Sequence, residues 1–491
     1  MTTPSVDWFA ISPSLALLAG GGAALLVAVL VPRWLRAPLA ALATACGFAG
    51  AFVAAALLYW KTPEAQTLLS DSMVRDRFGS LAQMIVAGAG VLVVGIAYER
   101  VSRSTHAAEF YALLAAAGGG MAFLVQAHNL MTLFLALEWF SVALYILCAI
   151  ELDVVGSLEA GLKYLIVGGF GSAVLLFGSA LVFGATGELG FEQIASATTS
   201  QNLVDDPLLV AGLAMIIAGL GFKSSAAPFH QWTPDVYEGA PTPVTAFMSA
   251  ATKTVAVVLT MRLLVTAFPE ESELWTIAIA FIVCASLAWG NLAALVQRNV
   301  KRLLAYSSIA HAGFLLIAVA SNNTLGGKAL LFYLIPYAAA SLGAFAVVAA
   351  RERELRAPVT LDNLAGLGWE RPLLGVAMWA FMLSFAGLPP TGGFVGKFYV
   401  FSAAYDRGWT WLVIVGVVAT LVSLYYYLAI IRALYMRSPL ELQLAPTGGS
   451  PPREFLLGTS VVLAMAVTIG SFIFVGPLID LAENGAASLP F

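Results

Sequence analysis

Long apolar stretches, each near the length of one bilayer crossing, follow one another along almost the whole chain, with short polar segments between them. A transmembrane helix needs about 20 mostly apolar residues. On this measure the sequence predicts about fourteen spans, at 12–32, 38–60, 79–98, 108–127, 129–150, 158–186, 207–232, 240–268, 274–296, 302–320, 328–350, 372–404, 410–431 and 455–482. The connecting segments are too short for a soluble domain. The predicted fold class is therefore an all-α, polytopic membrane protein in a lipid bilayer.

Basic residues are concentrated in one set of alternate loops, which predicts the orientation of the chain. This set holds Arg33, Arg36, Arg100, Arg103, Arg298, Lys301, Arg302, Arg351, Arg353, Arg356, Arg371, Arg432, Arg437 and Arg453. The other set holds Lys61, Arg75, Arg77, Lys328 and Arg407, with Arg262 near the end of a span. Because cytoplasmic loops carry an excess of lysine and arginine, the first set is predicted to face the cytoplasm. An even number of spans then places both termini on the outer side.

Two of the predicted spans are interrupted by proline. Pro228 breaks the seventh span, and Pro389 with Pro390 breaks the twelfth. Proline has no N–H, so the double proline leaves the carbonyls of Phe385 and Ala386 without their helical donors. Irregular backbone is tolerated at membrane depth only where it is buried in protein or lines a wet cavity. The breaks therefore indicate sites of transport.

The two breaks occupy matching positions in a predicted internal repeat. Spans 4–8 and 9–13 form two units of five, and the broken span is the fourth of each unit. Because five is an odd number, the second unit is inverted relative to the first. The predicted divisions are an N-terminal three-helix segment at 1–104, the first unit at 105–270, the second unit at 271–435 and a C-terminal helix at 436–491.

Six ionisable side chains stand out within the apolar spans. They are Glu138, Lys163, Lys223, Lys253, His311 and Lys397. A lysine at the centre of a bilayer is unfavourable by about 2.5–3.5 kcal/mol on insertion scales, so such residues are functional candidates by default. We therefore expect most of this group to act on protons or ions.

The placement of these groups follows the predicted repeat. Lys223 and Lys397 lie in the two broken spans, and Glu138 and His311 each lie in the second span of a unit. Lys253 lies in the fifth span of the first unit. The matching span of the second unit has hydroxyl groups instead, at Ser423 and Tyr425–Tyr427. The symmetry is inferred from these positions, because the sequences of the two units are only weakly similar.

Each candidate also has a simpler interpretation, which is a lysine extending to the surface near a helix end for Lys223 and a static ion pair for Lys253 and Lys397. Lys163 lies only about five residues inside its span, so its ammonium group could extend to the surface. Glu138 needs a cationic partner, and Lys223 is the natural one. Such a pair is what a proton relay requires, although an inert buried ion pair has the same composition.

Each of the two histidine candidates also has two possible interpretations. His311 is near Tyr306, Ser307 and Ser308, where it is either a relay group or a hydrogen-bonded core residue. His230 follows Pro228, toward the loop that contains Asp235 and Glu238. It either passes protons inward or caps the backbone of that loop.

Composition excludes several other classes of protein. The 491 residues are 60% hydrophobic and 11% charged, whereas a soluble domain is roughly 25% charged. No basic cluster indicates a nucleic-acid partner. The three cysteines, Cys46, Cys148 and Cys284, have no metal-binding or disulfide spacing and are expected to be free thiols. We find no nucleotide-binding, metal-ligating or hydrolase motif, and expect no metal or cofactor in this chain.

Three stretches of the sequence resemble a known family. They are FKSSAAPFHQWTPDVYEGAPTPVTAFMSAATK, LVQRNVKRLLAYSSIAHAGF and FAGLPPTGGFVGKFYVF. Together they resemble the signatures of the proton-pumping, antiporter-like membrane subunits of respiratory complex I. The resemblance covers most of the chain and is strongest over spans 4–13.

Within this family the chain is most similar to the branch called subunit N in bacterial NADH:quinone oxidoreductase. That branch has lysine in the broken twelfth span, where subunit M has glutamate. The chain also ends soon after the fourteenth span, without a long lateral helix like that of subunit L.

The resemblance implies a role for most of the candidate residues. Glu138 and Lys223 match the glutamate–lysine pair of the family, and Lys253 matches its central lysine. Lys397 matches the lysine on the exit side. Two further residues match the early lysine of span six and the relay histidine, namely Lys163 and His311.

The resemblance also implies the setting of the protein. It predicts a multi-pass protein of the bacterial inner (plasma) membrane, with other membrane-arm subunits of complex I as partners. NADH, FMN, iron–sulfur clusters and quinone are expected only in the complex. This chain would then be a subunit of an enzyme and contain no redox centre of its own.

Our hypothesis from the sequence is a proton-translocating subunit driven by redox chemistry in its partners. One alternative is a subunit of an Mrp-type cation/proton antiporter or of a membrane-bound hydrogenase, in which the same lysines would serve. An alternative of another class is a structural membrane subunit whose buried charges are inert pairs.

Overall fold

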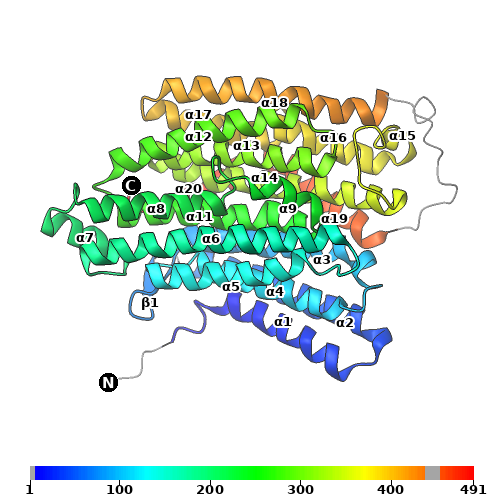
Figure 1. Cartoon of the computed structure of the whole chain (residues 1–491), viewed down its shortest axis with the longest axis horizontal. Helices are drawn as coiled ribbons and strands as arrows, with labels where there is room; N and C mark the ends of the chain where they lie inside the picture. Colours follow the sequence, from blue (N-terminus) through cyan, green and yellow to red (C-terminus); the bar gives the residue numbers. More distant parts are fainter. Residues whose placement is uncertain (1–5, 63, 437–453) are drawn as a thin grey trace.

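The computed structural model describes residues 6–62, 64–436 and 454–491. Arg437 and Arg453, two of the basic loop residues named above, lie outside these ranges. The described chain is a bundle of roughly parallel helices with one short antiparallel hairpin, β1 (Gln66–Leu68) and β2 (Met73–Arg75). Both described ends of the chain lie toward the end of the bundle that carries this hairpin and α7 (Phe191–Gln201), on the left in Figure 1.

Twelve helices of the described chain are long and apolar enough to cross a membrane. Eleven of them are α1 (Ser12–Leu30), α2 (Arg33–Lys61), α3 (Arg77–Val101), α4 (Ala107–Leu124), α5 (Leu130–Cys148), α6 (Val155–Thr186), α12 (Ser272–Leu295), α13 (Val300–Ser321), α14 (Thr324–Leu355), α18 (Thr410–Met436) and α19 (Phe455–Ile473). The other runs without interruption over Thr242–Ala267. It is built from α10 (Thr242–Phe247), the π-helical turn η1 (Met248–Thr252) and α11 (Lys253–Ala267).

The two remaining predicted spans are broken helices. In the seventh, α8 (Pro207–Lys223) ends before Pro228 and α9 (Trp232–Gly239) follows it. In the twelfth, α16 (Pro372–Ala386) ends before the double proline and α17 (Gly392–Asp406) follows. The helical membrane fold and both breaks are thus confirmed. The count of fourteen crossings and the inverted repeat stay predictions.

The sequence missed four smaller features. The hairpin and α7 occupy segments that were predicted to be loops. The fourteenth span, predicted as one helix, is divided into α19 and α20 (Val475–Ala486), while α15 (Leu367–Glu370) lies in a loop. Pro477 explains the division, because it has no N–H to donate to the carbonyl of Ile473.

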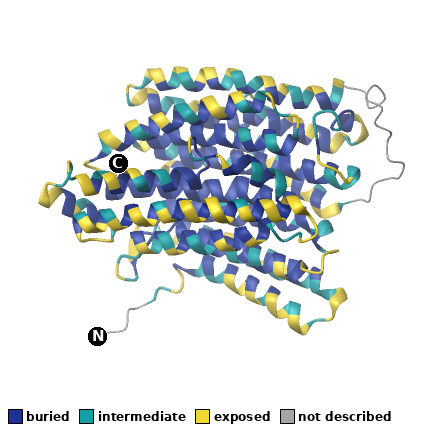
Figure 2. Cartoon of the chain, in the orientation of Figure 1, coloured by how far each residue is buried: buried dark blue, intermediate teal, exposed yellow. Residues whose placement is uncertain are grey.

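Burial increases from the outside of the bundle to its centre, as Figure 2 shows. The span Thr242–Ala267 is buried over its whole most apolar stretch, and α13 and α14 are almost as fully enclosed. The outer helices instead present large apolar side chains to the surroundings, as at Phe170 on α6 and Leu421 on α18. Soluble proteins rarely expose apolar surface on this scale, so these faces fit contact with lipid or with other membrane subunits.

A buried ion pair joins the N-terminal helices to the central span. Arg262 on α11 is enclosed, although the sequence placed it near a span end. Its Nη1 and Nη2 donate to Asp76 Oδ2 and Oδ1 at 2.6 and 2.9 Å. Asp76 also caps α3 by accepting from the Gly79 N–H at 2.7 Å. Each charge therefore has its counterion and two direct hydrogen bonds across the pair, which offset much of the cost of burying it.

Breaking this pair from one side is expected to destabilise the protein strongly. Asp76→Asn keeps an oxygen to cap α3 but leaves the guanidinium buried without a counterion, a change worth about 3–5 kcal/mol. Asp76→Asn combined with Arg262→Met removes both charges and is expected to be less harmful. The measurement is the temperature at which half of the protein extracted in detergent aggregates. Equal losses in the single and double variants would contradict this account.

Candidate functional site

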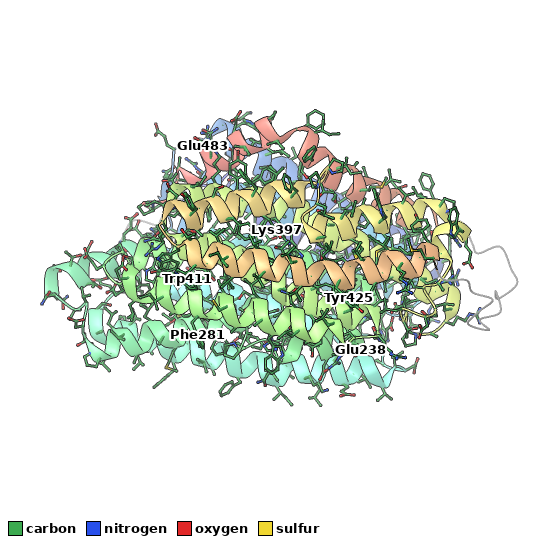
Figure 3. The ribbon with its side chains drawn as sticks, turned by 90° about the horizontal axis from the view of Figure 1, so that it is seen from above. Glu238, Phe281, Lys397, Trp411, Tyr425 and Glu483 are labelled. Carbon is green, nitrogen blue, oxygen red and sulfur yellow. The ribbon has the colours of Figure 1, made fainter. Side chains whose placement is uncertain are left out.

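The predicted site residues fall into two groups by burial. Lys223, His230, Lys253, His311 and Lys397 are all buried in the middle layers of the bundle. Figure 3 shows Lys397 about halfway along the bundle. Lys163 is different, because about 41% of its side chain is exposed. The structure thus gathers five of the seven candidates in the interior, with Glu138 partly buried, and leaves Lys163 at the surface of the chain.

Lys223, the last residue of α8, points into a pocket of aromatic rings. Its Nζ lies 4.8 Å from the centre of the Phe140 ring and 5.7 Å from that of Tyr164. Aromatic faces attract a cation when water is excluded. One hydrogen bond completes the site, from Lys223 Nζ to Ser141 Oγ on α5 at 2.5 Å.

Glu138 and Lys223 do not form the direct ion pair that the sequence suggested. Lys223 bonds Ser141 instead, and Ser141 lies three residues after Glu138 on the same face of α5. Glu138 Oε1 is buried and has no hydrogen-bond partner among the described residues. The Ser141 hydroxyl therefore bonds the buried ammonium of Lys223 and lies one helical turn from Glu138, whose Oε1 has no partner among the described residues.

The break after α8 is held by neighbouring helices. The Ala227 N–H donates to Ser286 Oγ on α12 at 2.8 Å, and Trp232 Nε1 donates to the Phe222 carbonyl at 3.2 Å. His230 follows the break with its ring 5.6 Å from that of Trp289, and its Nδ1 finds no partner among the residues described. Its ring lies against α12, and the described contacts include none with Asp235 or Glu238.

Lys163 belongs to a charged network at the basic end of the bundle. Its Nζ lies 2.7 Å from Glu159 Oε1 and 2.8 Å from Asp235 Oδ2. Arg302 Nη1 lies 2.7 Å from Asp235 Oδ1. Burial acts to raise the pKa of Asp235, but the hydrogen bonds from Lys163 and Arg302 outweigh it and lower that pKa overall. The ammonium of Lys163 reaches the surface of the chain, as the simpler interpretation of this residue expects. Its role in a proton relay stays a prediction.

Lys253 lies at the junction between the π-helical turn and α11. Single π-turns inside α-helices are often found at functional sites. Lys253 Nζ donates to the carbonyl of Ser308 on α13. This contact joins the fifth helix of the first predicted unit to the second helix of the other unit.

His311 is held at both ring nitrogens by tyrosine hydroxyls. Nδ1 lies 2.8 Å from the Tyr333 hydroxyl on α14, and Nε2 lies 3.1 Å from the Tyr427 hydroxyl on α18. Tyr427 also bonds Ser307 Oγ at 2.5 Å. A neutral imidazole has one N–H donor and one acceptor nitrogen, and hydroxyls can take either role.

Lys397 confirms what the sequence predicted for the double-proline break. Its Nζ donates to the Phe385 carbonyl at 2.9 Å, one of the two carbonyls that the prolines were predicted to free. The same ammonium lies 4.2 Å from the centre of the Phe314 ring. The break therefore supplies the acceptor that makes this lysine tolerable in the interior.

The buried groups do not form one unbroken hydrogen-bond chain. Among the described residues no hydrogen bond directly joins any two of Lys223, Lys253, His311 and Lys397. The hydroxyls that bond them, at Ser141, Tyr333 and Tyr427, were not predicted as site residues. Serine and tyrosine are common in apolar helices, and only the cluster beside His311 and the Tyr425–Tyr427 run gave any signal.

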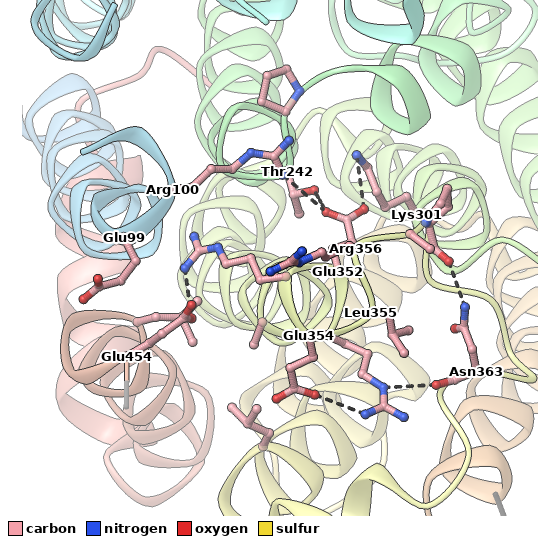
Figure 4. A pocket seen from close by; sticks show the side chains of 18 of the residues that line it. Glu99, Arg100, Thr242, Lys301, Glu352, Glu354, Leu355, Arg356, Asn363 and Glu454 are labelled. Atoms are coloured by element: carbon pink, nitrogen blue, oxygen red, sulfur yellow. Dashed lines mark hydrogen bonds and ion pairs between the residues drawn. The ribbon is translucent and has the colours of Figure 1, made fainter. Parts of the chain in front are cut away.

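A cavity of about 1650 Å³ lies where the predicted cytoplasmic ends of several helices meet. Figure 4 shows Glu352 between Thr242 and Lys301 in this cavity. Lys301 Nζ lies 3.7 Å from Glu352 Oε1 and donates to the Ala240 carbonyl at 2.8 Å. The cavity thus reaches the first residue of the span that contains Lys253. In the part of the chain that the structure describes, no cluster of His, Cys, Asp and Glu suits a metal ion.

Comparison with known proteins places this geometry in a family. Residues 127–423 match the family described as NADH:quinone oxidoreductase/Mrp antiporter, TM. The chain is 41% identical over 425 residues to NADH-quinone oxidoreductase subunit N 1 of Herpetosiphon aurantiacus, covering 86% of this chain and 85% of that one. It belongs to the subunit N branch of this family.

Solved structures agree with the assignment. A chain of respiratory complex I from Thermus thermophilus with bound aureothin matches with a TM-score of 0.79 at 34% identity, covering 96% of this chain and 99% of that one. A chain of the Mrp complex from Dietzia sp. DQ12-45-1b matches with a TM-score of 0.85 at 22% identity, over 97% of each chain. The second likeness shows only that the fold is shared. The sequence relatives favour subunit N over the Mrp alternative.

The contact between Ser141 and Lys223 can be tested by removing one oxygen atom. Ser141→Ala leaves a buried ammonium without its acceptor, which we expect to destabilise the protein by about 1–3 kcal/mol. The matched control is Ser179→Ala on α6, because that buried hydroxyl bonds only the Leu175 carbonyl of its own helix. Thermal denaturation in detergent measures both. Equal losses in the two variants would show that Ser141 does not hold Lys223.

Proposed function

We propose that this subunit N relative moves protons across the membrane through its own buried groups, driven by redox chemistry in its partner subunits. The observation that supports this most directly is the pair of broken helices, each of which places a lysine in the interior of the bundle. Lys223 lies at one break and Lys397 at the other, with Lys253 and His311 between them along the predicted path. The relay also includes Glu138, His230 and Lys163.

Proton uptake is proposed from the cytoplasm, near the broken seventh span. The cavity of about 1650 Å³ supports this, because Glu238 and Gly239 at the end of α9 help to line it. A path from there leads past Lys223 and Lys253 to His311 and Lys397, and protons leave on the outer side. Water is required along it, because direct hydrogen bonds do not join these groups.

Moving protons against the membrane potential requires an energy source outside this chain. Each charge costs about 2.3 kcal/mol per 100 mV. The NADH, FMN, iron–sulfur and quinone chemistry is assigned to other subunits of the complex. We propose that the coupling is electrostatic: a change of charge in a neighbouring subunit shifts Lys223 between Ser141 and Glu138. The unpaired Glu138 Oε1 supports this, because it offers the ammonium a second acceptor.

Two alternatives make different demands on the molecule. An Mrp-type antiporter would couple these lysines to a sodium gradient. We keep this alternative because the chain shares its fold with the Mrp chain. A structural subunit would use its buried charges only as inert pairs. The contacts of Lys253 and Lys397 favour transport over inert pairing, because both bond backbone carbonyls and neither has a carboxylate partner among the described residues.

The first test removes the charges at the start of the relay. Lys223→Ala and Glu138→Ala are expected to lower the number of protons moved per electron in proteoliposomes that contain the assembled complex. Each variant removes one of the two charged groups at the start of the relay. Lys328→Ala and Glu483→Ala are matched controls. They remove a lysine and a glutamate that pair with each other at 2.5 Å outside the relay.

Three outcomes separate the hypotheses. Normal proton stoichiometry in both relay variants would contradict the proposal that these groups carry protons. Poor assembly with normal stoichiometry per complex would support the structural alternative. A sodium-dependent pH change in vesicles would support the antiporter.

The predicted orientation can be tested with reporter fusions. With both termini on the outer side, alkaline phosphatase fused after Phe491 is expected to be active and a green fluorescent protein at the same site dark. The same reporters fused after Arg103, in a predicted cytoplasmic loop, should give the reverse. Fluorescence at the C-terminal fusion would overturn the orientation.

A further inference from the structure

We propose that Tyr427 and Tyr333 are relay residues: their hydroxyls carry the proton to and from His311. This inference rests on the proposed function and deepens it, because it names the groups that make the central step. The observation behind it is that each ring nitrogen of His311 has its own tyrosine, and the two tyrosines come from different helices, α18 and α14.

Tyr427 connects His311 to the side where Lys253 binds. Its hydroxyl lies 3.1 Å from Nε2 of His311 and 2.5 Å from Ser307 Oγ. Ser307 precedes Ser308, whose carbonyl accepts from Lys253. The hydroxyl of Tyr427 therefore bridges the histidine and the segment of α13 that holds the central lysine.

Tyr333 connects His311 to the side of Lys397. Its hydroxyl lies 2.8 Å from Nδ1. Its ring packs so closely on Gly396 that a Cβ at that position would lie only 2.4 Å from it. Gly396 directly precedes Lys397 in α17. The absence of a side chain at 396 thus allows the tyrosine to lie against the backbone beside the lysine on the proposed exit side.

The four groups can pass one proton, after which the three hydroxyls are as before and the histidine has its proton on Nε2 and no longer on Nδ1. At the start, Ser307 donates to Tyr427, Tyr427 donates to Nε2, and Nδ1–H donates to Tyr333. When a proton reaches Ser307, each group passes its own proton to the next, and Tyr333 releases one toward Lys397. One proton moves in and one moves out, and histidine suits this step because its two nitrogens exchange roles. Before the next proton arrives, the hydroxyls turn back and the histidine returns to its starting tautomer by proton exchange with water, releasing a proton at Nε2 and taking one up at Nδ1.

The position of Tyr427 also accounts for a gap in the predicted symmetry. The fifth helix of the first unit carries Lys253, and the matching helix α18 has no ionisable group in its core. Tyr425 on α18 is exposed and Tyr426 bonds Asn291, whereas Tyr427 points at His311. Both fifth helices therefore place a polar group on the same short segment of α13.

The test removes single hydroxyls and uses neighbouring tyrosines as controls. Tyr427→Phe is paired with Tyr426→Phe, because both rings are buried and the hydroxyl of Tyr426, although near Tyr427, bonds Asn291 Oδ1 at 2.9 Å and neither nitrogen of the histidine. Tyr333→Phe is paired with Tyr337→Phe, whose hydroxyl bonds Ser308 Oγ at 3.0 Å. Protons moved per electron are measured in proteoliposomes that contain the complex, per assembled complex.

We expect Tyr427→Phe and Tyr333→Phe to lower this ratio as far as Lys397→Ala does, and each control to keep the wild-type ratio. Tyr427→Phe combined with Lys397→Ala should cause no further loss, because both lie on one path. If Tyr427→Phe does not assemble, the Tyr333 and Tyr337 pair decides the question. A wild-type ratio in both relay variants, beside a lowered ratio in Lys223→Ala, would overturn this inference alone. A wild-type ratio in Lys223→Ala as well would overturn the proposed function.

Discussion

The structure depends on one constraint: every ammonium group inside an apolar bundle needs an acceptor that the helices do not normally offer. Helical carbonyls already accept one hydrogen bond within their helix, so a buried lysine needs a helix break, a hydroxyl or the second lone pair of a helical carbonyl. The double-proline break frees the Phe385 carbonyl for Lys397. Lys223 donates to the Ser141 hydroxyl, and Lys253 donates to the Ser308 carbonyl, which lies within the continuous helix α13.

These acceptors are weak partners compared with carboxylates, and that difference suits transport. A lysine held by a carboxylate in a dry interior is stabilised strongly in one charge state. A lysine held by one neutral oxygen has a less strongly stabilised charged form, so the loss of its proton costs less free energy. The Asp76–Arg262 pair shows the other solution in the same molecule. There the guanidinium has a bidentate carboxylate, and the contact joins α3 to α11 as a fixed part of the scaffold.

The centre of α13 is where the two predicted units meet. Lys253 approaches it from α11 and Tyr427 from α18, while Tyr333 reaches His311 from α14. The helix α13 itself, α14 and the span that contains Lys253 are the most deeply buried of the described spans. Water is therefore scarce there, and side-chain hydroxyls become the natural carriers between the ionisable groups.

The sequence by itself determined the helical membrane fold, both helix breaks and the burial of Lys223, Lys253, His311 and Lys397. Those features are local, because apolar length, proline chemistry and the cost of a buried charge can be read from neighbouring residues. It also indicated that the prolines free the Phe385 carbonyl. The tertiary structure decided what the sequence left open or placed elsewhere. Lys223 bonds Ser141 and not Glu138. Arg262 is buried as an ion pair with Asp76, and the Tyr427 hydroxyl is hydrogen-bonded to His311. Each of these contacts joins residues that are far apart along the chain. Serine and tyrosine have no distinctive pattern in an apolar helix, so only the packing of the helices reveals which hydroxyl meets which charge.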